Sequence, residues 1–524
     1  MIYLNITMED KNLTKEENNF LNKQVLNVSK LVKKDISKIT SNINNDNEIL
    51  LLGESTHGTR EFYEKRADIT KFMITNNNYK VILLEAEWPQ IIRINKYIQN
   101  TGDDSCIEDA FSNINKFPKW LWKNDVIYEL IEWLKEYNTN NKNDMVYIFG
   151  MDCQQFLQSM KFVKEYLKAI NHPFYDKTNL SLAIFRQFLT ESQYAIGAVH
   201  GAIKPMVHNI ISNLQGLLST FQWDHVDAFL NDPDKSKEDK IERLSCEQSF
   251  EIIVNGEEYF RKMLEEPAGS QASWNTRDQH MLMTIMRIRN RFEQIFGNIP
   301  KIIVWAHNSH IGNSNATSRG GKTFNSNNTW NVGQMVKEMF PKSLAIGFYT
   351  YKGSVTAAKK DERNGVTQEL ILSHPLSYEN LFKNVCDNQK IDEFYLDLRE
   401  YSKYDFDTNH INVKLDEYYR DIYTGEVFKT ANIITEKNKM TYLISNENKK
   451  YLFINPYGSI VTRCRKLNSF DYSCNEELFN SNLLQRWIGV NYVKETEMDS
   501  HYGESKLAKQ FDFVVFINNT NSLY

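Results

Sequence analysis

The chain of 524 residues is long enough for about two or three domains, and its content of 41% hydrophobic and 13% aromatic residues supports a large packed core. Its net charge of −5 argues against a general nucleic-acid binder, which needs basic patches. The six cysteines form no CxxC pair, so neither a disulfide scaffold nor a zinc ribbon is expected. The chain starts without a secretory signal and has no long apolar run, which predicts a cytoplasmic protein that does not contact the membrane.

The N-terminal part alternates apolar runs typical of buried strands with segments of helical periodicity. The predicted strands are Glu48–Leu52, Val81–Glu87 and Met145–Asp152. The predicted helices are an arm from Asn12 to Ile39, then Thr59–Thr75, Ile91–Ile98 and Phe117–Asn138. Strands of the buried type that alternate with helices predict an α/β fold, with a largely parallel sheet and flanking helices.

The middle of the chain, from Phe156 to about Phe296, has helical patterns and no convincing strand. Its predicted helices are Leu182–Ile196, Ile203–Phe221, Ser245–Leu264 and Ser273–Phe296. The buried-strand pattern returns at Lys301–Asn308 and Ser343–Tyr351, and again at Phe394–Leu398 and Phe511–Ile517. We therefore expect an all-helical insertion that splits one α/β domain.

Short aromatic and β-branched runs separated by turn signals fill the region Tyr418–Arg465. The turn signals are Thr424-Gly425, Asn446–Asn448 and Asn455–Gly458. This hairpin pattern predicts a small antiparallel β insertion toward the C-terminus. The predicted division is residues 1–155 for the first part of the core, 156–296 for the helical insertion, 297–400 for the second part of the core, 401–480 for the added β-rich region and 481–524 for the C-terminal part of the core.

Acidic side chains and imidazoles follow four of the predicted strands. They are Glu54 and His57 after the first strand, Glu85 at the end of the second, Asp152 after the third, and His307 and His310 after the fourth. Parallel sheets place ligands beyond the carboxyl ends of their strands, and these ends are neighbours in space. The pattern predicts one shared site, with the loop of Glu54 and His57, flanked by two glycines, as its catalytic segment.

The same side chains would suffice for zinc, since His307 and His310 lie three residues apart near the acids and His57. No HExxH or other tight ligand signature occurs, so this alternative rests on residue types alone. A serine nucleophile is disfavoured, because Ser55 lies in GEST and not in a GxSxG elbow. Cys153 is interpreted as a buried structural cysteine. His280 and His501 are weaker catalytic candidates.

Eight segments make the chain resemble the erythromycin esterase family along most of its length. They are GESTHGTREFYEKRADITKFMI at Gly53–Ile74, LLEAEWP at Leu83–Pro89, FPKWLWKN at Phe117–Asn124, SWNTRDQHM at Ser273–Met281, VWAHNSHIGN at Val304–Asn313, NVGQMV at Asn331–Val336, GFYTYKGSVTAA at Gly347–Ala358 and IGVNYVKETEMDSHY at Ile488–Tyr502. The region Tyr418–Arg465 falls outside the resemblance and is an addition to it.

The resemblance implies a metal-independent hydrolase, without a cofactor, of the macrolactone ester of macrolide antibiotics. It implies an α/β core, a helical insertion and a cleft between them, and a small-molecule ester as the partner. The implied general base is His57, and the residues in the other matching motif positions are Glu54, Arg66, Glu85, His307 and His310. Arg66 is suggested by the resemblance alone.

Ester hydrolysis needs a nucleophile, a proton acceptor and stabilisation of an oxyanion. We expect neutral His57 to take a proton from water held near Glu54 or Glu85, and Arg66 or a protonated His310 to face the oxyanion. Two other classes stay open. One is a hydrolase or transferase of a sugar or another metabolite, such as one of exopolysaccharide biosynthesis. The other is a non-catalytic binder of a metal or tetrapyrrole.

Overall fold

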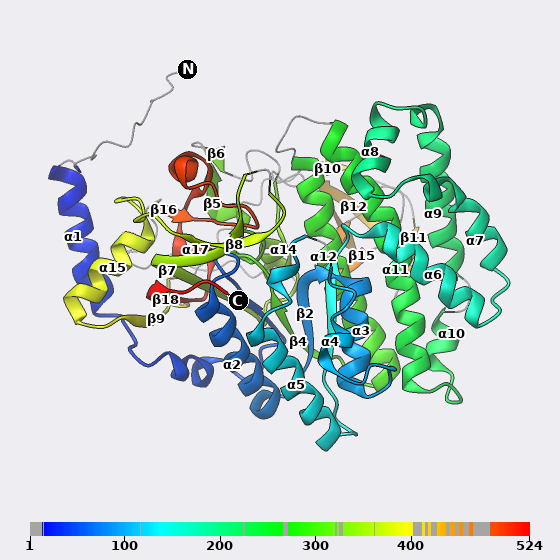
Figure 1. Cartoon of the computed structure of the whole chain (residues 1–524), viewed down its shortest axis with the longest axis horizontal. Helices are drawn as coiled ribbons and strands as arrows, with labels where there is room; N and C mark the ends of the chain where they lie inside the picture. The colour runs from blue at the N-terminus through cyan, green and yellow to red at the C-terminus, as the bar shows by residue number, and fades with distance from the viewer. Residues whose placement is uncertain are drawn as a thin grey trace.

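The computed structural model describes residues 13, 15–115, 117–223, 226–265, 271–319, 322–323, 329–360, 362–401 and 483–523, together with the backbone of six strands between 411 and 464. An eight-stranded sheet crosses the core (Figure 1). In spatial order its strands are β3 (Tyr147–Asp152), β2 (Tyr79–Glu87), β4 (Lys301–Trp305), β1 (Ile49–Leu52), β7 (Ser343–Ala358), β18 (Phe513–Thr520) and β9 (Glu393–Asp397), with β8 (Gly365–Glu369) paired to β7. The first six run parallel, and β9 and β8 are antiparallel to their neighbours.

The strands on either side of the helical block belong to this one sheet. Strand β1 pairs in parallel with β4, and Ile49 lies opposite Ile302. Strand β3, which precedes the helical block, pairs in parallel with β2. The prediction of one largely parallel sheet split by a helical insertion is therefore confirmed.

The sheet is buried on both faces, because successive side chains of a strand point to opposite sides. Ile49 and Leu51 of β1 belong to one apolar cluster, whereas Leu50 and Leu52 belong to the other. The helices that contribute to these clusters include α2 (Arg60–Asn77), α3 (Trp88–Gln99), α5 (Asp125–Asn140), α12 (Gln271–Phe296), α14 (Val332–Met339) and α15 (Tyr378–Gln389). Continuous apolar strands in the sequence are thus explained by helices on both faces.

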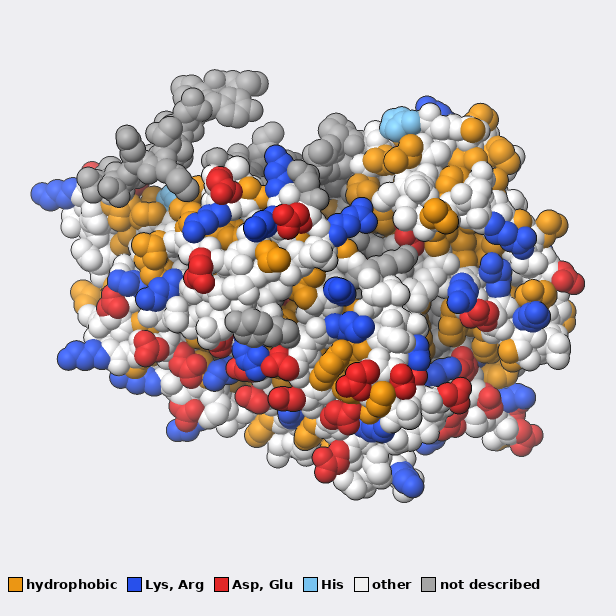
Figure 2. Space-filling view, in the orientation of Figure 1, with side chains coloured by type: hydrophobic (Ala, Val, Ile, Leu, Met, Phe, Trp, Pro, Cys, Tyr) orange, Lys and Arg blue, Asp and Glu red, His pale blue; other side chains and the backbone are white. Residues whose placement is uncertain are grey.

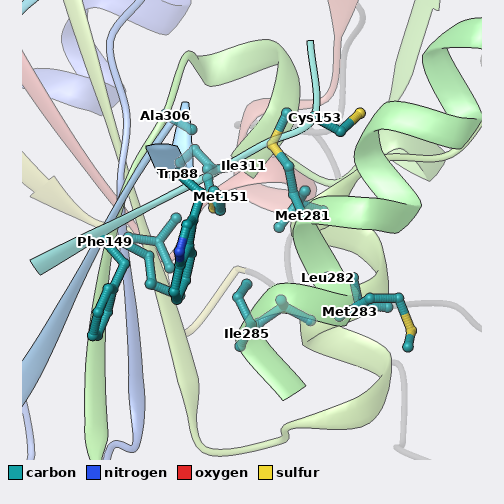
Figure 3. Packing of buried hydrophobic residues seen from close by; sticks show 14 of the residues in the cluster. Trp88, Phe149, Met151, Cys153, Met281, Leu282, Met283, Ile285, Ala306 and Ile311 are labelled. Atoms are coloured by element: carbon teal, nitrogen blue, oxygen red, sulfur yellow. The ribbon is translucent and has the colours of Figure 1, made fainter. Parts of the chain in front are cut away.

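Figure 3 shows how one face of the sheet meets the helical part of the chain. The rings of Trp88 and Phe149 stack, with centroids 4.6 Å apart and an interplanar angle of 4°. Met281 and Ile285 of α12 belong to the same buried cluster. Burial of each such side chain stabilises the fold by about 1.5–3 kcal/mol, so this contact joins α12 firmly to the sheet that carries the site.

Helices make up the block between β3 and β4. They are α6 (Phe156–Ala169), α7 (Tyr175–Ser181), α8 (Glu191–Val199), α9 (Val207–Trp223), α10 (Val226–Asn231), α11 (Lys237–Glu265) and α12. Residues 156–223, 226–265 and 271–296 include no strand, which confirms the all-helical character of the block. Figure 2 shows hydrophobic side chains gathered over α8 and α9. Throughout the described part of the chain, no helix has the length and apolar character that crossing a membrane requires.

Two predicted helices were placed wrongly, because capping side chains start the helices later than the periodicity indicates. The segment Leu182–Ile196 is interrupted, and α8 begins after Thr190, whose side chain accepts a hydrogen bond from the Gln193 N–H at 3.2 Å. The predicted helix Phe117–Asn138 starts only after Asn124, which caps the first turn of α5. Such side chains satisfy N–H groups that the first helical turn leaves free.

The predicted N-terminal arm is also not one helix. It consists of α1 (Lys15–Ser29) and a separate 3-10 helix, Ile36–Asn42. Asp35 caps the second helix by accepting a hydrogen bond from Ser37 N at 3.2 Å. The apolar residues keep one helical period across both helices, so the sequence pattern does not show the break between them. The remaining short helices are α4 (Ile107–Ala110), α13 (Asn308–Ile311), α16 (Glu497–Ser500) and α17 (Leu507–Gln510).

Two antiparallel sheets accompany the main sheet. The first, of six strands, confirms the predicted antiparallel region and comprises β10 (Ile411–Val413), β11 (Tyr418–Arg420), β12 (Val427–Thr435), β13 (Thr441–Ser445), β14 (Lys450–Phe453) and β15 (Val461–Cys464). The three predicted turns lie outside the described residues. The second sheet was not predicted and comprises β16 (Leu483–Arg486), β17 (Tyr502–Ser505), β5 (Thr317–Arg319) and β6 (Lys322–Thr323). The domain boundaries drawn from the sequence stay predictions.

Candidate active site

Neighbouring strands of the parallel sheet end in polar side chains that the fold brings together. The backbone N–H of Asn308, just after β4, donates to the carbonyl oxygen of Glu54, just after β1, at 2.8 Å. The backbone N–H of His307 donates to Oε2 of Glu85, in β2, at 2.8 Å. The segments that follow β1 and β4 and the end of β2 therefore meet at one edge of the sheet, as expected for a ligand site of a parallel sheet.

The loop between β1 and α2 is held by segments that are distant in sequence. The His57 N–H donates to the Ile488 carbonyl at 2.8 Å, and the Ile488 N–H donates to the Ser55 carbonyl at 2.9 Å. Gly58 has a φ of +71°, and a Cβ atom there would lie 2.1 Å from the carbonyl oxygen of Thr356. Only glycine fits this turn, so the loop that carries His57 has a fixed course.

Glu54 links His57 to Arg66 through its two carboxylate oxygens. Oε1 lies 2.8 Å from His57 Nδ1, and Oε2 accepts a hydrogen bond from Arg66 Nη2 at 3.0 Å. Arg66 is fully buried, and its guanidinium lies 4.4 Å from the ring centroid of Tyr63 and 4.6 Å from that of Trp305. Burial raises the pKa of Glu54, but the charges of Arg66 and His57 outweigh it and hold this pKa below its ordinary value. The carboxylate is therefore ionised.

His57 keeps one ring nitrogen available. Nδ1 is engaged by Glu54, whereas Nε2 has no hydrogen-bond partner among the residues that the structure describes. The side chain retains 9% of its accessible area, and its ring centroid lies 4.9 Å from that of His307. A carboxylate on one nitrogen and an open second nitrogen is the arrangement that a general base needs.

His307 lies next to His57, but its two ring nitrogens are occupied. Nδ1 accepts a hydrogen bond from the Ser309 N–H at 3.1 Å, and this hydrogen bond caps α13. Nε2 lies 3.0 Å from the carbonyl oxygen of Ser55. Nε2 therefore carries the proton. Burial and the neighbouring His57 lower the pKa of His307 to about 3. His307 is a neutral ring that joins the end of β4 to the loop of His57.

Glu85 lies at the centre of a second charged group, which includes Arg277 of α12. Arg277 Nη2 donates to Glu85 Oε1 at 2.7 Å and to Asp152 Oδ2 at 2.6 Å. Burial raises the pKa of Glu85, yet the charges of His310 and Arg277 hold it well below its ordinary value. The same carboxylate lies 3.3 Å from His310 Nε2. Glu85 is therefore an ionised bridge between two cationic side chains.

His310 is enclosed by two carboxylates and an indole ring. Nδ1 lies 2.8 Å from Asp278 Oδ1, and the imidazole stacks on Trp274 with ring centroids 4.4 Å apart and an interplanar angle of 4°. Burial lowers the pKa of His310, but Asp278 and Glu85 outweigh this effect and raise it to about 9. The imidazolium would donate from Nε2 to Glu85, whereas the Arg277 Nη1 atom, 3.1 Å away, can only donate to a neutral Nε2. The two carboxylates therefore favour the charged ring and Arg277 opposes it.

Sequence reasoning missed Trp274, Arg277 and Asp278. The three residues lie on α12, and no strand end pointed to a helix of the inserted block. They all fall in the segment SWNTRDQHM, which contributes to the family resemblance but gave these three residues no role. Arg277 and Asp278 bind Glu85 and His310 respectively, so this segment completes the site from the helical side.

The family model described as erythromycin esterase matches residues 74–520. The chain belongs to the erythromycin esterase family. Among curated proteins, it is 22% identical to YbfO of Bacillus subtilis (strain 168), which carries a provisional hydrolase name, over 68% of this chain and 75% of that protein. It is also 22% identical to erythromycin esterase type II of Escherichia coli, over 51% of this chain and 61% of that protein. Family membership supports a hydrolase.

Solved structures share the fold of this erythromycin esterase family member. A succinoglycan biosynthesis protein aligns with a TM-score of 0.62 at 16% identity, over 98% of this chain and all of the other. A Bacillus cereus protein aligns with a TM-score of 0.62 at 17% identity, over 96% and 98% of the two chains. A mutant erythromycin esterase in its open conformation aligns with a TM-score of 0.56 at 14% identity, over 93% and 94%. The chain therefore shares its overall fold with these three proteins.

The two weaker histidine candidates of this family member serve local structure. His280 is buried between α11 and α12, with Nδ1 2.9 Å from the amide of Asn255 and Nε2 3.2 Å from that of Gln248. Burial lowers the pKa of His280 to about 3. The ring of His501 lies 3.1 Å from the carbonyl oxygen of Trp487 and holds the segment between β16 and β17.

The other nucleophile and metal alternatives find little support in the geometry. Cys153 is fully buried, and burial raises the pKa of its thiol well above the ordinary value. The hydroxyl of Ser55 is buried and has no hydrogen-bond partner, and so no neighbouring base, among the described residues. Within the described ranges, no group of three or more His, Cys, Asp or Glu side chains is arranged to hold a metal ion. Metal independence stays a prediction.

Proposed function

We propose that this chain is a carboxylic ester hydrolase in which His57 activates water. The single observation that carries this proposal is the state of the His57 ring, with Nδ1 2.8 Å from an ionised Glu54 and with no partner for Nε2 in the described part of the chain. The carboxylate fixes the tautomer with the proton on Nδ1 and favours the imidazolium as it forms. Arg66, which binds the far oxygen of Glu54, acts as a positioning residue through that carboxylate.

The proposed reaction is a hydrolysis in two proton transfers. His57 Nε2 takes a proton from water, and the water oxygen forms a bond to the ester carbonyl carbon. The tetrahedral intermediate then breaks the bond to the alcohol oxygen, which takes the proton back from the imidazolium. A carboxylic acid and an alcohol are released, and His57 returns to its neutral form. General-base catalysis of this kind contributes about 10²–10⁴-fold to the rate.

We assign oxyanion stabilisation to the second charged group of the site. Arg66 has no exposed surface and binds Glu54, so it is poorly placed for the role that the sequence suggested. Arg277 keeps 15% of its side-chain area exposed and lies 3.1 Å from His310 Nε2 through its Nη1 atom. Arg277 is held by Glu85 and Asp152 beside His310, so its guanidinium is a preorganised donor, which is the usual way to stabilise an oxyanion.

The substrate that we propose is a lactone or another bulky ester, with the macrolactones of macrolide antibiotics as the first candidates. Support comes from family membership and from the relative named as an erythromycin esterase. We also propose that the protein acts in the response to antibiotic and that it is located in the cytoplasm. Support for the alternative substrate, a metabolite of exopolysaccharide synthesis, comes from the structural neighbour named as a succinoglycan biosynthesis protein.

A panel of purified substrates tests this function. The full-length protein is incubated with macrolides of different ring size and with simple p-nitrophenyl esters, and products are followed by mass spectrometry. We expect at least one lactone to gain one water molecule as its ring opens. If neither lactones nor simple esters are hydrolysed, while an exopolysaccharide-derived acyl sugar is, the macrolactone assignment is wrong.

A further inference from the structure

The segment from Ile488 to Tyr492 runs between the loop of His57 and the end of β7. Ile488 exchanges backbone hydrogen bonds with Ser55 and His57, at 2.9 and 2.8 Å. Two residues further on, the Val490 carbonyl accepts a hydrogen bond from Ala358 N–H at 2.9 Å, and Tyr492 N–H donates to the Ala358 carbonyl at 2.9 Å. Backbone hydrogen bonds of the residues before and after Gly489 therefore fix its backbone position.

A buried ion pair fixes the backbone just before this segment. Arg486 is fully buried and donates from Nε to Glu497 Oε1 at 2.8 Å. Its Nη1 atom also donates to the carbonyl oxygen of Tyr351, in β7, at 3.1 Å. A side chain introduced at position 489 would thus find a rigid backbone, and its direction would be set by that backbone.

Gly489 differs from the two glycines of the catalytic loop in the space around it. A Cβ atom on Gly53 would lie 2.0 Å from Asn308 Oδ1, and one on Gly58 would meet the backbone of Thr356. A Cβ atom on Gly489 would come within 4 Å of only one described atom outside its chain neighbours, His57 Cδ2, at 4.0 Å. Gly489 is therefore not required by crowding or by a positive φ, and its missing side chain leaves space beside His57.

That space adjoins the reacting edge of the imidazole. Cδ2 is bonded to Nε2, the ring nitrogen of His57 that has no partner in the described part of the chain, whereas Nδ1 on the other side is covered by Glu54. A substrate or water that reaches Nε2 must pass near this edge. Whatever occupies position 489 therefore controls how much room a reactant has at His57.

We propose that Gly489 is a specificity-determining residue that keeps this edge open for the bulky part of an ester. The proposal rests on the function proposed above for His57. It deepens that function because it predicts a preference for esters with large groups next to the reacting bond. A side chain at position 489 should exclude large esters first and small esters later, since a steric limit acts on size.

Chemical modification of His57 tests the access claim without any substrate. Wild-type protein and the variants Gly489→Ala, Gly489→Val and Gly489→Leu are treated with diethyl pyrocarbonate, and the modified histidines are resolved by peptide mass spectrometry. We expect the modification rate of His57 to fall in steps from glycine to leucine, while exposed histidines react unchanged. Gly216→Leu is the matched control, since Gly216 lies exposed on α9 with no described atom within 4 Å of a Cβ.

Ester hydrolysis by the same variants tests the specificity claim. For p-nitrophenyl octanoate we expect Gly489→Leu to lower kcat/KM by about 10-fold or more relative to its effect on p-nitrophenyl acetate. The Gly216→Leu control should hydrolyse both esters at the wild-type ratio. If Gly489→Leu fails to fold, the alanine and valine variants give the same comparison over a smaller range of size.

The outcomes separate this proposal from the proposed function. If wild-type protein hydrolyses no ester, the proposed function fails, and the modification of His57 still decides whether position 489 limits access to His57. If a folded Gly489→Leu variant leaves the modification rate of His57 at the wild-type value, position 489 does not face the reacting edge and the proposal is overturned. Equal losses for the small and the large ester would also overturn it, because they would indicate a general disturbance of the loop.

Discussion

The loop of His57 and the helix pair α11–α12 contain the same kinds of buried side chain, yet only the loop leaves a reactive atom open. In the helix pair, Arg291 binds both oxygens of Glu247, at 2.8 and 3.0 Å, and both ring nitrogens of His280 face side-chain amides. In the loop, Arg66 and His57 bind the two oxygens of Glu54, and His57 Nε2 has no described partner.

This difference shows that burial and charge alone do not mark a functional histidine. His280 is more deeply buried than His57, and its pKa is lowered to about 3. Its shift comes from structural packing between two helices, where each polar atom must find a partner. The loop instead collects its side chains from the ends of separate strands, so that polar groups converge at an edge of the sheet.

Among variants of the buried carboxylates in the two regions, Glu54→Gln should have the largest effect, and that effect is on activity. Glutamine keeps the size of the side chain but cannot hold the His57 tautomer as a carboxylate does, so we expect kcat to fall by about 100-fold or more. The matched variant Glu247→Gln should leave kcat near wild type and lower the free energy of unfolding by about 3 kcal/mol, since it breaks a buried ion pair. Turnover on the best substrate and thermal unfolding measure the two effects. The distinction between the regions fails if Glu247→Gln lowers kcat as much as Glu54→Gln.

A smaller effect is expected at alkaline pH through His310. The pKa of His310 is raised from the ordinary value of 6.5 to about 9, so the imidazolium persists through neutral pH and is lost as the pH rises through about 9. If the imidazolium supports the oxyanion, kcat/KM should fall over the same range. Asp278→Asn removes a carboxylate that raises this pKa, so the alkaline limb should move to lower pH. An alkaline limb that stays in place in Asp278→Asn would remove His310 from the mechanism.

The smallest effect is expected from removal of metal ions. The described histidines and acids form no group that could hold a metal. Both ring nitrogens of His307 are engaged in hydrogen bonds with backbone groups. We therefore expect full activity after dialysis against a chelator. Activity that is lost on dialysis and restored by zinc or manganese would require His57 to be reconsidered as a ligand.

Much of the fold could be predicted because buried parallel strands have a strong sequence pattern. The runs at Glu48–Leu52, Val81–Glu87 and Lys301–Asn308 are apolar on both faces, and each contains a strand of the sheet. The four-stranded sheet of β5, β6, β16 and β17 was missed, because its strands are two to four residues long and lie far apart in sequence. Helix starts were misplaced where single capping residues such as Thr190 decide the boundary.

The strand-end residues of the site could be predicted for the same reason, but their pairing could not. In the sequence, Glu54 and Glu85 were equivalent candidates for the carboxylate near the water that His57 activates. The structure assigns Glu54 to His57 and Glu85 to His310 and Arg277. The contributions of Arg277 and Asp278 depend on how α12 packs on the sheet, which is a tertiary contact that no local pattern encodes.

The most direct test of the account compares His57→Gln with His280→Gln, the same substitution in the two regions. Steady-state hydrolysis of the best substrate is measured for both variants, with circular dichroism and thermal unfolding as folding controls. We expect His57→Gln to lower kcat by about 100-fold or more with the fold intact, because the proton acceptor is lost. We expect His280→Gln to lower the free energy of unfolding by about 1–3 kcal/mol, from buried hydrogen bonds that are disturbed, and to keep kcat within a few-fold of wild type. A folded His57→Gln variant that retains more than about a tenth of the wild-type rate would contradict the assignment of His57 as the general base.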